Sequence, residues 1–290
     1  MALIDFIWNL ACLLLWLNWR SVHFDPLGER RPATLIGTLR PAEPQPLRRW
    51  YMPLAIAGLL LLRAAIYFVV GSAAKPVWSG ILNLGVTAPA FSSNSFFRML
   101  LFSGLSFGKM VGVFYLWLLL LSLLAPQNHQ PFHRWIQMPL GTVDRWPRWA
   151  KLLLPFTVTA VLWWLLSWLL VWQSVIPGPV TSAGRIQAAV LMGLESYLVW
   201  KYAAGVLLAL HLLNSYIYFG KHPLWPYINA EAQTMLSPFR RFPLRLDKVD
   251  FAPVVEIALI FFLAGCAQDG LKLPWFKIPG LEDVYEKLPF

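Results

Sequence analysis

The sequence has few charged residues and few cysteines, and both shortages exclude classes of protein. Only 13% of the 290 residues are Asp, Glu, Lys or Arg, whereas 58% are hydrophobic. Soluble domains carry about 25% charged residues, so this composition indicates a polytopic membrane protein. Cys12 and Cys266, the two cysteines, both lie in apolar runs, which argues against a disulfide framework and a cysteine-based metal site.

Catalytic motifs are also lacking. The chain has no nucleophile elbow, no phosphate-binding loop and no metal-ligand spacing, so we predict no enzymatic activity and no metal. The formal net charge of +10 could suggest nucleic acid, but no nucleic-acid-binding motif or soluble basic domain accompanies it. In a membrane protein, basic loops more often record topology. We therefore expect no nucleic-acid partner.

Apolar runs dominate what is present. Since a membrane-spanning helix needs about 20 apolar residues, they predict an all-α polytopic membrane bundle with about six spans. The first run could instead be a secretory signal, but it contains Asp5 and no small-residue cleavage site follows it. The predicted spans are residues 2–19, 52–74, 96–125, 152–176, 186–220 and 251–267.

The loops differ sharply in positive charge. Those after the first, third and fifth spans hold six, four and five Lys or Arg residues, whereas those after the second and fourth hold one each, Lys75 and Arg185. Positively charged loops stay in the cytoplasm. We therefore predict a multi-pass protein of a bacterial-type inner membrane with both termini on the periplasmic side.

Two segments of similar layout suggest an internal repeat. Residues 128–166 and 222–263 each consist of a proline-broken, basic and aromatic loop followed by an apolar helix, with Pro155 corresponding to Pro253. Such self-similarity is the signature of repeated units. We predict a two-helix extension (1–95), a first repeat (96–185), a second repeat (186–267) and an amphipathic periplasmic tail (268–290).

The two repeat loops combine aromatic and basic side chains in a pattern that suits the headgroup layer of a membrane. Aromatic bodies sink into the interface there, and cations meet anionic lipid. Lipid anchoring and docking of a partner protein both remain open. The candidate interface residues are Trp135, Arg145, Arg148, Pro238, Arg240, Arg241, Asp250 and Pro253.

Polar residues at membrane depth are candidates for function because burying a charge in hydrocarbon is costly. Arg63, Lys109, His211 and Glu256 meet this criterion. His211 and Glu256 fall at similar depths, so they could face each other, or each could have a separate structural partner. As His211 is the single deep histidine, paired haem ligation is not predicted, and we expect no cofactor, with haem association as the alternative.

Gly104, Gly108 and Gly112 repeat at four-residue spacing in the third predicted span. This spacing places them on one helix face, where small residues allow another helix to approach closely. The alternative is that they are scattered membrane glycines. We predict a helix-packing face.

Several motifs in the second repeat resemble the YggT family of small integral membrane proteins. They are the run from Ser237 to Arg241, then Pro243, Asp250 and Pro253, and the run from His211 to Tyr216. In the first repeat Asn128, Pro139, Asp144 and Pro155 match, and the resemblance covers roughly residues 96–267. Two departures are His211 in place of an Arg and Lys248-Val249 in place of Gly-Gly.

The resemblance to the YggT family implies a role in osmotic tolerance or in the cell envelope or division. In chloroplast relatives it implies maturation of the haem-bearing cytochrome b6. From these considerations we predict a non-enzymatic scaffold or assembly factor that docks on another membrane protein. An ion or osmolyte channel or transporter, and a structural subunit of a larger membrane complex, are the alternatives.

Overall fold

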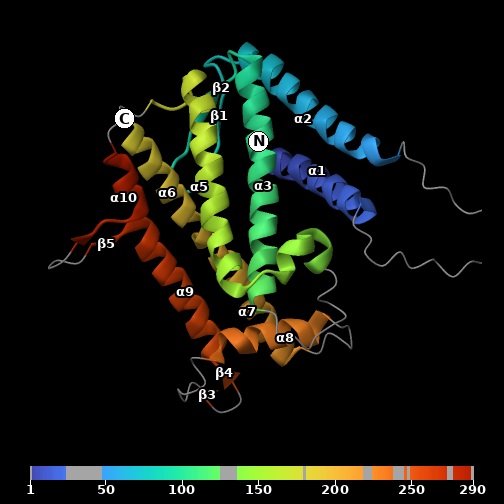
Figure 1. The fold of residues 1–290 in the computed structure, drawn as a ribbon, viewed down its shortest axis with the longest axis vertical. Helices are drawn as coiled ribbons and strands as arrows, with labels where there is room; N and C mark the ends of the chain where they lie inside the picture. The colour runs from blue at the N-terminus through green and yellow to red at the C-terminus, as the bar shows by residue number, and fades with distance from the viewer. Residues whose placement is uncertain are drawn as a thin grey trace, which may run out of the picture. The chain divides into compact units, whose positions relative to one another are not determined.

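The computed structural model describes residues 2–23, 48–124, 136–178, 181–217, 224–237, 245–246, 249–272 and 277–288 (Figure 1). Five helical segments in this part of the chain are long and apolar enough to cross a membrane. They are α2 (Arg48–Ala73), α3 (Phe96–Leu124), α5 (Arg148–Trp172), α6 (Ser182–Leu198) continued by α7 (Trp200–Tyr216), and α9 (Ala252–Asp269). The prediction of an all-α polytopic membrane bundle is confirmed.

Helix α1 (Ala2–His23) forms over the first predicted span but is not among these five segments. That α1 crosses a membrane therefore stays a prediction.

The remaining elements are short. They comprise a 3-10 turn η2 (Gly141–Arg145), helices α8 (Leu224–Met235) and α10 (Leu281–Glu286), and three two-stranded ribbons. The ribbons pair β1 (Ser79–Ile81) with β2 (Ala90–Ser92), β3 (Arg245–Leu246) with β4 (Val249–Asp250), and β5 (Leu271–Lys272) with β6 (Lys277–Ile278).

The chain divides into two compact units. Unit 1 comprises Met1–Gly80, Phe91–Gly112 and Gln137–Gly141, and unit 2 comprises Ile81–Ala90, Val113–Ile136 and Thr142–Phe290. This division falls within α3 and does not follow the predicted repeat boundaries. The repeats themselves stay a prediction.

In unit 1, α1 packs along α2, and the first half of α3 joins them. Two side chains reach adjacent backbone carbonyls in the middle of α2. The Trp8 indole of α1 donates to the Leu59 carbonyl at 3.0 Å, and the Ser103 hydroxyl of α3 donates to the Leu60 carbonyl at 3.0 Å. These two hydrogen bonds fix both neighbours at the same level of α2.

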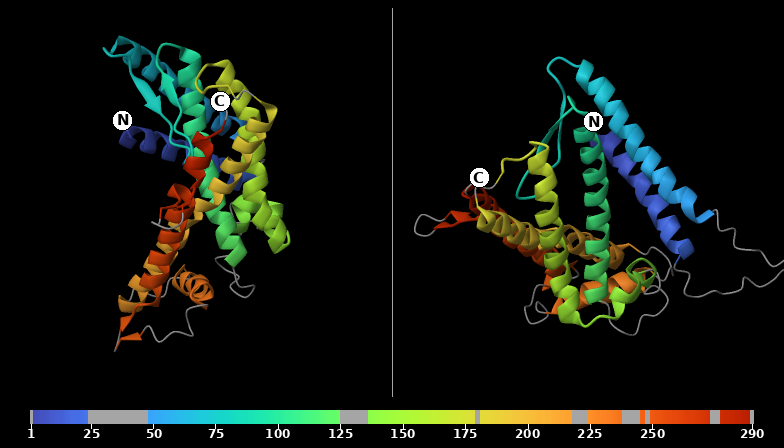
Figure 2. Two further views of the ribbon diagram at one scale, coloured as in Figure 1. Left: turned by 90° about the vertical axis from the view of Figure 1, so that its left-hand side faces the viewer. Right: turned by 45° about the horizontal axis from the view of Figure 1, so that its top comes forward.

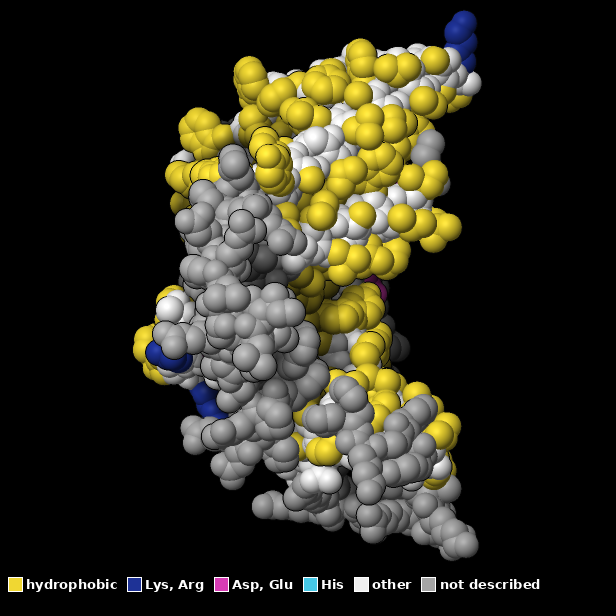
Figure 3. Space-filling model, turned by 90° about the vertical axis from the view of Figure 1, so that its right-hand side faces the viewer, with side chains coloured by type: hydrophobic (Ala, Val, Ile, Leu, Met, Phe, Trp, Pro, Cys, Tyr) yellow, Lys and Arg dark blue, Asp and Glu magenta, His cyan; other side chains and the backbone are white. Residues whose placement is uncertain are grey.

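Hydrophobic side chains cover much of the molecular surface, as a membrane-embedded chain requires. Among the described side chains on the face shown in Figure 3 they predominate, and the visible Lys and Arg side chains lie at its margins. On α2 several large apolar side chains are exposed: Leu54, Leu61, Leu62, Ile66, Val69 and Val70. In water such a surface would aggregate, whereas lipid solvates it.

Unit 2 contains two antiparallel helix pairs. In the first, α5 and α6 lie side by side (Figure 2). Gly193 permits a close approach, because a Cβ there would lie 2.8 Å from the Phe156 ring. At one end of the pair the Tyr197 hydroxyl donates to the Leu152 carbonyl at 2.6 Å, and at the other Arg185 stacks over a tryptophan ring.

The second pair consists of α7 and α9. Leu208 of α7 is fully buried in a cluster with Ala232 of α8, and Ala252 and Ile257 of α9 pack against that cluster. In Figure 1, α8 runs across the foot of unit 2 rather than along α5. Helix α8 is therefore held by its buried face against the helix pair.

Helices α6 and α7 follow one another with an interruption at Val199. No proline or glycine explains it. The Ser196 hydroxyl donates back to the Gly193 carbonyl at 2.7 Å, an arrangement that often bends helices. Just beyond the interruption, the Trp200 indole donates to the Leu116 carbonyl of α3 at 3.0 Å. Tertiary contacts therefore accompany the break.

The two repeat prolines occupy different helical positions. Pro253 is the second residue of α9, where its missing N–H costs little. Pro155 lies inside α5, because that helix begins earlier than predicted, at Arg148. The expected equivalence of the two prolines therefore does not extend to helix geometry.

The two ends of unit 2 collect different loops. At one end, η2 meets the end of α3 and the start of α5. Helix α8 lies near them: burial raises the pKa of Tyr227 on α8, and the negative charge of Asp144 contributes to the same rise. The tip of the β1–β2 ribbon instead meets α10, where Thr87 hydrogen-bonds with Tyr285. η2 and α8, which belong to the basic loops of the two predicted repeats, thus lie at the same end of unit 2.

Candidate functional site

Arg63 lies at the centre of a buried polar network in unit 1. Its side chain is 1% exposed, and its Nη1 donates to the Asn9 amide oxygen at 2.7 Å. The Asn9 amide donates onward to the Ser106 hydroxyl at 2.8 Å. Asp5 lies 3.7 Å from the Arg63 Nε and accepts from the Tyr67 hydroxyl at 2.6 Å. The network therefore joins α1, α2 and α3.

Aromatic rings complete the surroundings of the Arg63 guanidinium. Its centre lies 5.5 Å from the Phe102 ring centroid and 5.9 Å from that of Tyr67. Cation–π attraction of this kind strengthens when water is excluded. Nε and Nη2 of Arg63 make no hydrogen bond. The ion pair and the rings thus offset part of the cost of burying this charge.

The sequence analysis identified Arg63 but missed its partners on α1. Asp5 and Asn9 are four residues apart, as are Arg63 and Tyr67. Residues at this spacing share one helix face. The two spacings together were the signal that could have predicted a polar contact between these helices.

His211 and Glu256 have separate surroundings. The Nδ1 atom of His211 lies 2.8 Å from the Asn229 amide oxygen of α8, in hydrogen-bond contact. Glu256 is 6% exposed, and its Oε2 atom accepts no hydrogen bond. The structure thus pairs His211 with Asn229 rather than with Glu256.

The glycine face of α3 is open. At Gly104, Gly108 and Gly112, a Cβ would meet no atom within 4 Å beyond chain neighbours and its own helix backbone. Lys109 lies on the same half of α3 and is exposed. Within unit 1, no described residue therefore packs on the predicted face.

A second buried polar network, in unit 2, was not predicted. The Lys151 ammonium donates to the Ser122 hydroxyl at 2.7 Å, and that hydroxyl donates to the Asp144 carboxylate at 2.5 Å. The ammonium lies 3.6 Å from the same carboxylate, and both side chains are under 10% exposed. We call these three residues the loop clasp, because they tie η2 to α3 and α5.

The loop clasp contains a serine and a lysine in contact, a pairing that some hydrolases use. Catalysis by such a pair requires a neutral lysine as the general base. Here the lysine donates to the serine hydroxyl, and that hydroxyl donates to the Asp144 carboxylate rather than to the lysine. The arrangement therefore favours a structural function for the clasp.

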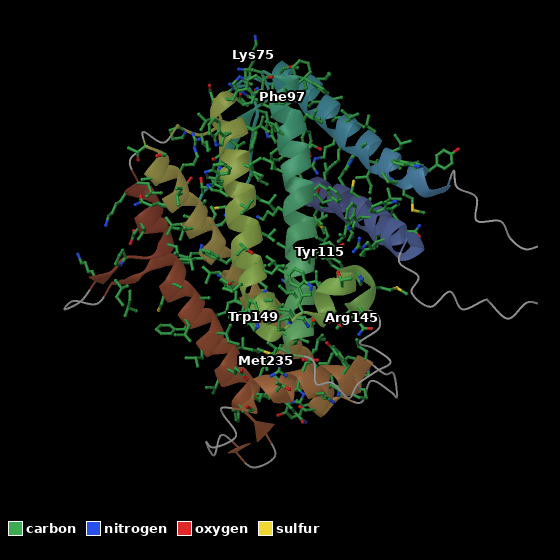
Figure 4. All side chains as sticks on the ribbon, in the orientation of Figure 1. Lys75, Phe97, Tyr115, Arg145, Trp149 and Met235 are labelled. Carbon is green, nitrogen blue, oxygen red and sulfur yellow. The ribbon has the colours of Figure 1, made fainter. Side chains whose placement is uncertain are left out.

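Immediately beside the loop clasp, five consecutive residues are exposed: Arg145, Trp146, Pro147, Arg148 and Trp149. The tryptophans are 45% and 68% exposed. Figure 4 labels Trp149 near the start of α5 and Arg145 beside the turn that precedes that helix. We call these residues the basic-aromatic corner. Of the predicted interface residues, Arg145 and Arg148 belong to it.

Glu231 on α8 is a further buried acid that the sequence did not single out. It is 0% exposed, and neither carboxylate oxygen accepts a hydrogen bond of regular geometry. Burial raises its pKa to about 7, and the Tyr227 hydroxyl nearby lowers it by less. The carboxyl is therefore close to half protonated near neutral pH.

Several predicted interface residues lie outside the described residues, namely Trp135, Pro238, Arg240 and Arg241. The backbone of Asp250 pairs with Arg245 across β3 and β4, and Pro253 is buried near the start of α9. Among the residues that the structure describes, no group of three His, Cys, Asp or Glu side chains could hold a metal ion.

Comparison of the chain with protein-family models, with curated proteins and with solved structures gives no match in any of the three. The class follows from the fold alone: the chain is a polytopic α-helical integral membrane protein. The resemblance to the YggT family stays a prediction.

Proposed function

We propose that this protein is a non-enzymatic membrane scaffold or assembly factor of YggT-like type that docks on other integral membrane proteins. The observation that carries the proposal is the open glycine face of α3, formed by Gly104, Gly108 and Gly112. Because apolar surfaces gain little from leaving lipid for one another, helices in membranes associate where small residues allow close contact. This face offers a partner helix such a contact.

The buried networks support the same proposal. The network around Arg63 extends over α1, α2 and α3. In the loop clasp, Lys151 contacts Ser122 and Asp144. Both networks use their charges to join helices of the same unit. A structural function for these charges agrees with a protein that acts through its surface.

The test is co-purification after extraction from native membranes in a mild detergent. Gly108→Leu should remove the stoichiometric partner protein, because the isobutyl group fills the face. Gly58→Leu is the matched control, since Gly58 is an open glycine of α2 that belongs to no such row. Equal partner recovery with both variants would refute the proposal, as would a wild-type protein that is isolated alone.

Transport of an ion or osmolyte is the second candidate function, and Glu256 favours it. A nearly buried carboxylate whose Oε2 atom accepts no hydrogen bond is a feature of ion pathways. Flux into liposomes that wild-type protein supports and Glu256→Gln abolishes would establish this candidate. The third candidate, a structural subunit, uses the same glycine face and predicts a constant stoichiometry within a larger complex.

We further propose an inner-membrane location with both termini on the periplasmic side. The charge difference between the loops supports it. In unit 2, η2 and α8, which lie in the loops after α3 and α7, share one end. Cysteine labelling at Ser174, between α5 and α6, should occur from outside intact spheroplasts, whereas labelling at Thr142 should require permeabilised membranes.

A further inference from the structure

We propose that the basic-aromatic corner is a binding site for the headgroup of an anionic phospholipid, and that the loop clasp holds it in its binding conformation. The proposal is independent of the scaffold function. It rests on how the structure distributes the charges of one short segment.

The segment from Asp144 to Lys151 carries three cations and one anion in eight residues. The Lys151 ammonium is directed inward, where Asp144 and Ser122 satisfy it. Arg145 and Arg148 lie outside with exposed side chains. The loop clasp thus accounts for one cation and the only anion, and the exposed surface keeps two positive charges.

The aromatic side chains indicate that the occupant is a lipid. Trp146 and Trp149 alternate with the two arginines and are exposed. Tryptophan is enriched at the membrane interface, where its ring is embedded at headgroup level. An acidic protein segment would also meet the arginines, but it would leave the rings without the apolar layer that suits them.

The position along the chain supports this assignment. α5 is one of the helices apolar enough to cross a membrane, and it begins at Arg148. The corner therefore lies where that span leaves the hydrocarbon. Guanidinium groups at this level can bind phosphate through paired N–H donors.

The loop clasp positions the segment that carries Arg145 and Arg148. It joins η2, the end of α3 and the first turn of α5 through side chains that are nearly inaccessible to water. Arg145 directly follows Asp144 in sequence, and Arg148 precedes Lys151 by three residues. Loosening the clasp should therefore weaken lipid binding although both arginines remain.

The experiment is native mass spectrometry of the full-length protein in detergent, titrated with palmitoyl-oleoyl phosphatidylglycerol or with the corresponding phosphatidylcholine. The wild type should prefer phosphatidylglycerol. R145Q/R148Q should bind it about thirtyfold more weakly, as expected for two interfacial cations, with phosphatidylcholine binding unchanged. The matched control is K75Q/K287Q, which removes two exposed positive charges from other parts of the chain and should keep the preference.

An unchanged preference in R145Q/R148Q would overturn the site, and so would an equal loss in K75Q/K287Q, which would indicate a general charge effect. Loss of a co-purifying protein from R145Q/R148Q with the lipid preference intact would assign the corner to a protein partner instead. For the clasp, D144N/K151M should reduce the preference while circular dichroism remains helical, and K151R should retain it. If a folded D144N/K151M kept the full preference, the positioning contribution would be wrong.

Discussion

The ion pair of the loop clasp gives a quantitative prediction. Asp144 and Lys151 lie 3.6 Å apart with side chains 6% and 8% exposed. At an effective dielectric constant of about 20, two unit charges at this distance attract each other by about 4–5 kcal/mol. Desolvation offsets much of this attraction when the pair forms, but removing one partner leaves the other buried and uncompensated. Each single variant, Asp144→Asn or Lys151→Met, should therefore lower the free energy of unfolding by about 3 kcal/mol or more.

The double variant separates the pair from its surroundings. In D144N/K151M neither charge remains, so the destabilisation should be smaller than the sum of the two single effects by about 2–3 kcal/mol. The assay is reversible unfolding in mixed dodecyl maltoside and dodecyl sulfate micelles, followed by circular dichroism. Lys75→Met, at an exposed position, should change stability by less than about 0.5 kcal/mol. Additive effects of Asp144→Asn and Lys151→Met would refute the reasoning.

Three further predictions concern other contacts. Burial raises the folded-state pKa of Glu231 to about 7 from an ordinary 4.5, so between these pH values the folded protein binds a proton that the unfolded chain releases. Stability should therefore fall as pH rises from about 4.5 to 7, by up to about 1.4 kcal/mol per pH unit. Glu231→Gln should flatten this dependence in a pH series of unfolding curves. Gly85→Ala should destabilise by about 2 kcal/mol, because Gly85 has a φ of 94° and a Cβ there would overlap the Glu195 carboxylate. Trp200→Phe should cost about 1 kcal/mol through loss of the hydrogen bond to the Leu116 carbonyl.

Controls keep these three measurements specific. Glu286→Gln, in an exposed position of α10, should leave the pH dependence as in the wild type. Gly58→Ala, where a Cβ would meet open space, should be neutral or slightly stabilising. Trp172→Phe, at a 72% exposed indole, should cost less than Trp200→Phe, and an equal cost would contradict the argument for the Leu116 contact.

The sequence predicted the helices well because hydrophobicity over about 20 residues is a local property. The third span was expected at residues 96–125 and is α3, Phe96–Leu124. The interruption at Val199 could not be predicted in this way. Its surroundings contain no proline, and the contacts beside it, such as that of Trp200 with Leu116, join residues far apart in the chain.

The polar sites were predicted less completely than the helices. Arg63 stands out in sequence because a charge in an apolar run is rare, yet its partners on α1 depend on which helix faces meet. Lys151 was counted among the loop cations, whereas the structure buries it against Ser122 and Asp144. Both results depend on tertiary pairing, and a list of local charges does not contain that information.

The network around Arg63 has a consequence for the order in which the helices of unit 1 can assemble. Asp5 and Asn9 belong to α1, which is synthesised before α2 and α3, but the guanidinium and hydroxyl that they contact are on those later helices. During synthesis the two polar side chains of α1 therefore lack these partners until Ser106, 97 residues after Asn9, has been made. Helices made later complete its polar contacts, so a nascent chain that ended before Arg63 would hold α1 only weakly.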